Sequence, residues 1–221
     1  MKCFFIILIS LFFLNSYAQT DNIGKIKYTP DYEFKEGIFI SFEQVKLNKP
    51  VNISRILSDI DHNSFNFFKE LVEKEKIYFF DDFGIKQEVE TKKLWGYSRS
   101  GTLYINYNRE FNRIPVVGNI SHFIADVTVL RERMSDPFHY NRYYSPINST
   151  YETREMRQYL LDFSSGKIYR HDIQGVEVFL MRDIELYDEF NQLKKRKKKK
   201  MLFFYIRKFN DNNPLYLFKY Q

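Results

Sequence analysis

The middle of the chain alternates apolar and polar residues, and this alternation predicts β-hairpins. Leu103 and Ile105 alternate with more polar neighbours, which is typical of a strand with one buried face. Similar runs flank Gly84, Gly118 and Gly166, and glycine readily adopts the positive φ angles that tight hairpin loops need. We therefore expect about eight strands, joined in sequence by hairpins.

Helical spacing precedes this region. Phe68 and Leu71 fit one face of a short helix that Ser64 would cap. Ser41 and Gln44 have the spacing of a capping box at the start of another short helix. The N-terminal part of the chain is therefore predicted to contribute short helices.

Helical spacing also returns in the C-terminal part. Asp172 is the predicted cap of a helix over residues 173–181, and Asp183 is that of a long basic helix over residues 183–210. Residues 131–155 show neither the helical spacing nor the strand alternation of apolar residues, and we expect a long irregular loop there.

The order of these elements predicts an α+β fold with an antiparallel sheet, because the helices do not alternate with the strands. We expect one hairpin-built sheet of about eight strands, short N-terminal helices and two C-terminal helices, the last one long.

The N-terminus has the three parts of a secretory signal. Lys2 supplies a positive start, and residues 3–14 are apolar apart from one serine. Ser16 and Ala18 place small side chains at the positions that signal peptidase reads, so cleavage is predicted between Ala18 and Gln19. The alternative is that the segment is retained as an anchor.

Cleavage of residues 1–18 would leave residues 19–221, which we expect to fold as one domain. The single cysteine, Cys3, lies in the signal, so the exported chain would form its core without disulfides. No later apolar run reaches the length of a transmembrane helix. We therefore expect a periplasmic or extracellular protein, either free or associated with the envelope.

Five stretches of the chain carry a resemblance. They read "GIFISFEQV", "LWGYSRSGTLYINYN", "FNRIPVVGNISHFIADVTV", "QYLLDFSSGKIY" and "YDEFNQLKKRKKKKMLFFYIRKFNDNNPLY". Together they resemble an uncharacterised family of exported proteins from Bacteroidetes-type bacteria. The resemblance implies a Gram-negative envelope setting and carries over no activity and no catalytic residue.

The positive charge is concentrated in one place. The net charge is +6, and it becomes +5 without Lys2 and −2 without seven consecutive cations as well. These seven residues, called the cationic segment below, are Lys194, Lys195, Arg196, Lys197, Lys198, Lys199 and Lys200. Lys197 falls where the apolar stripe of the predicted helix should continue.

Two interpretations of the cationic segment stay open. It is either a solvated stretch of helix or a binding surface for an anionic envelope component, namely lipid head groups, lipopolysaccharide or glycan. Export argues against nuclear import and against a nucleic-acid partner.

One stretch has part of the pattern of a calcium-binding loop. Asp59, Asp61, Asn63 and Glu70 occupy positions 1, 3, 5 and 12 of such a loop. Ser64 stands where the loop needs glycine, and it is also the predicted cap of a helix. Calcium is therefore a weak candidate, and no cofactor is predicted.

The sequence matches known catalytic motifs only weakly. Ser164 and Lys167 match a serine-hydrolase pattern, but they lie in a predicted turn, whereas the pattern belongs at a helix start. His122 and Asp126 share a strand face about 13 Å apart, which is too far for direct contact.

Exposed aromatic side chains on a sheet can stack on sugars. Four candidates surround one predicted hairpin: Trp95, Tyr97, Tyr104 and Tyr107. Strand alternation requires part of this set to be core, which weakens the glycan-binding interpretation.

The sequence thus favours an exported envelope protein acting as a non-enzymatic binding or structural module. One alternative is a peripheral binder of anionic membrane or lipopolysaccharide through the cationic segment. The other is an envelope hydrolase whose active site is assembled from scattered residues.

Overall fold

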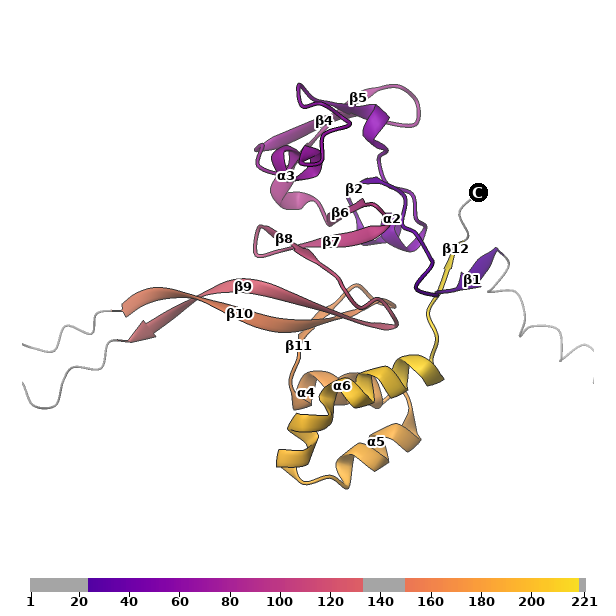
Figure 1. Ribbon diagram of the computed structural model, residues 1–221, viewed down its shortest axis with the longest axis vertical. Helices are drawn as coiled ribbons and strands as arrows, with labels where there is room; N and C mark the ends of the chain where they lie inside the picture. Colours follow the sequence, from indigo (N-terminus) through magenta and orange to yellow (C-terminus); the bar gives the residue numbers. More distant parts are fainter. Residues whose placement is uncertain (1–23, 133–149, 219–221) are drawn as a thin grey trace, which may run out of the picture.

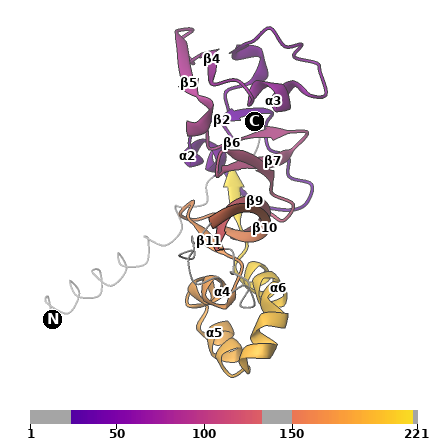
Figure 2. The same ribbon diagram turned by 90° about the vertical axis from the view of Figure 1, so that its left-hand side faces the viewer.

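The computed structural model describes residues 24–132 and 150–218. The molecule is elongated, with β-structure in its upper and central parts and three helices at its lower end (Figure 1). Figure 2 shows the same order from the side, with a long hairpin seen nearly end-on between the two ends. All the strand pairs of the described residues are antiparallel, which confirms the α+β class.

The described strands form four separate sheets, so the prediction of one sheet of about eight strands is wrong. The upper sheet has the order β3 (Ile56–Leu57), β4 (Lys76–Phe80), β5 (Lys86–Glu90). The central sheet has the order β2 (Gly37–Phe39), β6 (Gly96–Arg99), β7 (Thr102–Tyr107), β8 (Glu110–Arg113). The other two are β1 (Lys25–Lys27) with β12 (Tyr216–Phe218), and β11 (Ile168–Arg170), β10 (Thr150–Asp162), β9 (Ile120–Glu132).

Short helical turns lie along the chain between strands of the upper and central sheets. These turns are α2 (Phe42–Lys46), η2 (Ile53–Arg55), α3 (Phe67–Leu71) and η3 (Thr91–Lys93). The capping box of Ser41 and Gln44 is confirmed at α2. The predicted cap Ser64 is wrong: α3 begins after Asn66, and the Ser64 hydroxyl instead accepts a hydrogen bond from the Asn66 N–H.

Strands β9 and β10 form a hairpin that projects from the body (Figure 1). They pair without interruption from Ile120↔Asp162 to Glu132↔Thr150. Strand β11 covers only Tyr159, Leu160 and Leu161 of β10, so the outer part of the hairpin extends beyond it. The prediction of a loop over residues 131–155 is therefore wrong at both of its ends, and residues 133–149 lie outside the described residues.

Three helices, not two, form the lower end: α4 (Ile173–Leu180), α5 (Ile184–Asn191) and α6 (Lys195–Asn212). The predicted caps are confirmed, because Asp172 accepts from the Gly175 N–H and Asp183 accepts from the Leu186 N–H. The single helix predicted over residues 183–210 is wrong. The chain turns between α5 and α6, which lets the buried Phe190 ring pack on Tyr205, at 4.9 Å between centroids.

An amide clamp attaches the helical end to the hairpin. Asn210 on α6 accepts a hydrogen bond from the Ile120 N–H and donates one to the Ile120 carbonyl, each 2.8 Å long. Asn119 donates to the Asn213 carbonyl at 2.7 Å. The end of α6 is therefore fixed to the start of β9.

The described helices include none that is both long enough and apolar enough to cross a bilayer. The predicted signal, with its cleavage site between Ala18 and Gln19, lies outside the described residues.

Candidate functional site

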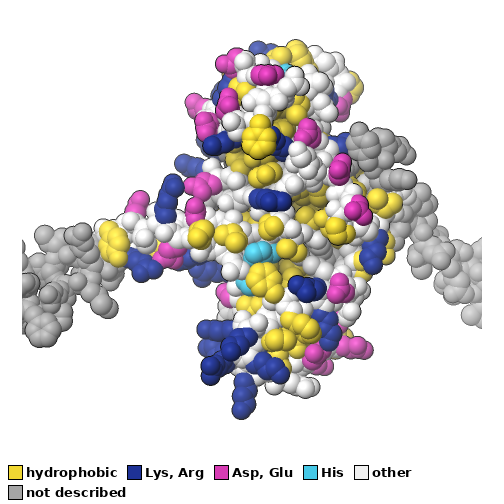
Figure 3. Space-filling model, viewed as in Figure 1, with side chains coloured by type: hydrophobic (Ala, Val, Ile, Leu, Met, Phe, Trp, Pro, Cys, Tyr) yellow, Lys and Arg dark blue, Asp and Glu magenta, His cyan; other side chains and the backbone are white. Residues whose placement is uncertain are grey.

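The cationic segment, residues 194–200, occupies the start of α6 and is largely exposed. Lys194 is the N-cap, and α6 begins at Lys195. Six of the seven cations are exposed to solvent, whereas Lys198 is half-buried. Figure 3 shows Lys and Arg side chains gathered at the lower end of the molecule, over the beginning of this helix. The segment thus presents a compact positive surface.

Lys198 is the member of the segment that faces the protein. Its Nζ lies 2.7 Å from Glu177 Oε1 and 2.7 Å from Asn191 Oδ1, and 4.8 Å from the centre of the Phe190 ring. Lys197, expected at the position where the apolar stripe of one long helix should continue, does not lie there, because the break before α6 changes the helical phase. Lys197 is exposed, and Lys198 lies on the buried side.

The other cations of the segment have no carboxylate partner among the described residues. The acids of α5 bind elsewhere: Glu189 pairs with Lys208, and Asp183 accepts from Asn212 and Asn213. Helix α6 has no acidic residue in its first turn and no side-chain cap. Positive side chains therefore lie at the positive end of the helix dipole, where they are unfavourable.

Two partly exposed aromatic rings of α6 adjoin the cationic segment. Phe203 and Phe204 are 46% and 49% exposed, whereas Leu202, Tyr205 and Ile206 of the same helix are buried. Residues four apart are neighbours on a helix, so Phe204 lies beside Lys200. The outer face of α6 therefore combines cations with accessible apolar surface.

The side chains proposed as calcium ligands do not lie around one common point. Asp59 pairs with Lys74, whose hydrogen bond lowers the Asp59 pKa. Asp61 accepts from the Asn63 N–H within its own turn, and Glu70 belongs to α3. Within residues 24–132 and 150–218, no group of three or more His, Cys, Asp or Glu side chains is arranged to hold a metal ion.

The serine-hydrolase pattern forms a turn around a buried carboxylate. The Asp162 side chain is 1% exposed, and it accepts hydrogen bonds from Ser164, Ser165 and Arg182. Burial alone raises the Asp162 pKa, but the bonds from Arg182 and the serines outweigh burial and hold it well below its usual range. The serines are thus structural donors, and the prediction of a turn here is confirmed.

The aromatic residues considered for glycan binding are partly or fully buried. Tyr97 is stacked between Phe68 at 4.9 Å and Tyr104 at 4.6 Å, measured between ring centroids. Trp95 packs edge-on against Phe39. Tyr97 and Tyr104 thus pack in the core between the upper and central sheets, whereas Trp95 and Tyr107 pack in the core that the central sheet shares with β9 and β10.

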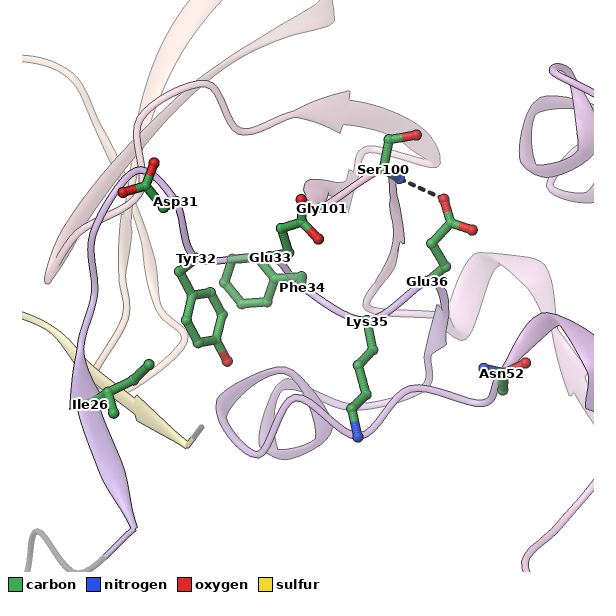
Figure 4. Close-up of a pocket in the computed structure, with 10 residues that line it drawn as sticks. All are labelled: Ile26, Asp31, Tyr32, Glu33, Phe34, Lys35, Glu36, Asn52, Ser100 and Gly101. Carbon is green, nitrogen blue, oxygen red and sulfur yellow. Dashed lines mark hydrogen bonds between the residues drawn. The ribbon is translucent and has the colours of Figure 1, made fainter. Parts of the chain in front are cut away.

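A cavity of about 750 Å³ opens beside the extended stretch over residues 31–36 (Figure 4). Its rim carries the carboxyl groups of Asp31, Glu33 and Glu36, which Figure 4 shows well apart from one another. Glu36 accepts a hydrogen bond from the Ser100 N–H at 2.6 Å. The described lining includes no histidine and no cysteine.

Among the described residues, His122 has no carboxylate partner, and it packs beside another histidine. The His122 and His171 rings lie 5.4 Å apart between centroids, where β9 and β11 meet the helices. Sequence analysis missed this pair, because the two residues are far apart in the chain and no local motif links them.

Comparisons of the chain with protein-family models, with curated proteins and with solved structures each find no match. The resemblance to exported proteins of Bacteroidetes-type bacteria therefore stays a prediction.

Proposed function

We propose that the chain is a non-enzymatic binding module of the cell envelope, exported by its N-terminal signal, that docks onto an anionic lipid surface through the cationic segment. The observation that carries the proposal is the group of six exposed cations without a carboxylate partner in the described part of the chain. Phospholipid head groups and the lipid part of lipopolysaccharide both present phosphate, so they share the chemistry that the segment would recognise.

The electrostatics support an external anionic partner. Each cation near an anionic membrane surface contributes about 1 kcal/mol of attraction, so six give a large gross attraction. Within the molecule the same charges are unfavourable, because Lys195 and Lys199 repel each other one turn apart and both lie at the positive end of α6. An anionic surface would relieve both effects.

The exposed rings favour lipid over glycan. Phe203 and Phe204 offer apolar surface next to the cations, and interfacial helices combine these two features. A bilayer has an apolar layer below its phosphates, into which Phe204 can insert. An anionic glycan has no such layer.

The first test is cosedimentation with vesicles containing equal parts of phosphatidylglycerol and phosphatidylcholine. A variant carrying Lys195→Gln, Arg196→Gln, Lys199→Gln and Lys200→Gln should lose about 1 kcal/mol of binding free energy per substitution. The matched control carries four exposed lysines changed to glutamine elsewhere: Lys49, Lys69, Lys86 and Lys167. Both variants change the net charge equally, but only the first should lose most of its binding.

Two further vesicle compositions distinguish phospholipid from lipopolysaccharide as the source of the bound phosphate. Vesicles of pure phosphatidylcholine should bind weakly, and vesicles containing lipid A show whether lipopolysaccharide serves as well. Binding should fall in about 0.5 M salt, where the Debye length is only about 4 Å. Equal loss of binding in both four-fold variants, or binding unchanged by salt, contradicts the proposal.

A further inference from the structure

His122 and His171 are held close together by backbone contacts. The His122 N–H donates to the Val116 carbonyl at 2.9 Å, and the His171 N–H donates to the Gln158 carbonyl at 3.0 Å. The Phe203 ring of α6 packs on both imidazoles, at 4.8 Å from His122 and 4.4 Å from His171 between centroids. Figure 3 shows histidine at the surface beside hydrophobic side chains, between the hairpin and the helical end.

Each imidazole has a nitrogen whose lone pair is available. Gln158 Oε1 lies 3.1 Å from His122 Nε2 and can only accept, so Nε2 carries the proton and the lone pair is on Nδ1. His171 Nε2 is buried and has no hydrogen-bond partner. Native structures rarely leave a buried polar atom unsatisfied, so this nitrogen calls for an explanation.

We propose that His122 Nδ1 and His171 Nε2 bind one divalent first-row transition-metal ion, such as Cu²⁺, Ni²⁺ or Zn²⁺. Imidazole nitrogen is a preferred ligand of these ions. The carboxamide of Gln158 would act as the outer partner that fixes the His122 tautomer, as carbonyl and carboxylate groups commonly do for ligating histidines. Water would complete the coordination, because the pair supplies two ligands.

The spacing of the rings fits this arrangement. With a metal–nitrogen distance of about 2.0–2.1 Å and a tetrahedral angle, two imidazoles that share an ion have ring centroids about 5 Å apart. The observed separation of 5.4 Å is close to this value.

The test is isothermal titration of the purified protein with Cu²⁺, Ni²⁺ and Zn²⁺ at pH 7. We expect one ion per chain, with Cu²⁺ bound most tightly, following the general order of affinities. His171→Gln and His122→Gln should each weaken binding by at least about tenfold, and Gln158→Ala by about tenfold. The control His62→Gln changes a histidine that packs against Phe67 of α3, away from this pair, and should leave the affinity unchanged.

A second measurement keeps the test valid if a variant fails to fold. Long-range ¹H–¹⁵N spectra of the unaltered protein should show Zn²⁺ shifting the ring nitrogens of His122 and His171 and leaving those of His62 in place. Unchanged ring signals at saturating zinc, or full affinity in His171→Gln, would overturn the proposal.

Discussion

At the scale of single residues, the buried carboxylate of Asp162 depends on Arg182. Removing the guanidinium leaves a buried charge supported only by the serines of its turn. Arg182→Ala should therefore lower the free energy of unfolding by about 3 kcal/mol. Urea denaturation measures the change. Arg170→Ala, which removes an exposed arginine nearby, should cost less than about 0.5 kcal/mol. Equal effects of the two substitutions would show that the serines alone satisfy Asp162.

The same carboxyl group gives the fold a pH dependence. Its folded-state pKa is held below the usual 3.8, so its stabilisation is complete above that value and is lost as the pH falls through the folded-state pKa. Asp162→Asn removes this contribution. Between about pH 5 and pH 2, the free energy of unfolding should fall more steeply in the unaltered protein than in Asp162→Asn. Parallel pH profiles from urea denaturation would contradict this assignment.

At the scale of elements, α6 carries both a buried phenylalanine, which stabilises the fold, and a phenylalanine that faces solvent. Phe209 is 2% exposed and Phe204 is 49% exposed. Phe209→Ala should lower the free energy of unfolding by about 3–5 kcal/mol, as for other buried phenylalanines. Phe204→Ala should change it by less than about 0.5 kcal/mol. Thermal and urea denaturation of the two variants gives the comparison.

The substitution Phe204→Ala also tests the proposed docking. It should weaken adsorption to vesicles but not to a soluble anionic glycan, because only the bilayer accepts the ring. Strong destabilisation by Phe204→Ala would instead place this ring in the core.

Local elements could be predicted from the sequence wherever neighbouring residues determine them. The caps Ser41, Asp172 and Asp183 were correct, because a capping side chain bonds to backbone N–H groups two or three residues away. The break between α5 and α6 was not predictable. Lysine is a good helix former, and the turn is favoured by the burial of Phe190 against Tyr205, which is a tertiary contact.

At the scale of the whole molecule, the Asn210 clamp is one of the contacts that join the helices to the hairpin. Asn210→Ala would leave the N–H and carbonyl of the fully buried Ile120 without their partner and should cost about 2 kcal/mol. Hydrogen exchange of the Ile120 amide should accelerate at the same time. Asn212→Ala, which removes a bond between exposed groups, should leave that amide protected.

The arrangement of the sheets could not be read from the sequence, because the pairings that decide it are distant. Strand β2 pairs with β6 through Gly37↔Ser98, and β1 pairs with β12 through Lys25↔Phe218. Hairpin signals between adjacent strands say nothing about such partners. The same limit hid the His122–His171 pair, which forms only after β9, β11 and α6 meet.

The uncompensated cations at the start of α6 also imply a trade-off between stability and function. Dissolved salt screens their mutual repulsion, so the fold should become more resistant to heat under the conditions that release it from an anionic membrane. Replacing Lys195 with glutamate would suit the helix dipole and should raise the melting temperature while weakening docking. Selection for thermal stability alone would therefore be expected to remove lysines from this helix end.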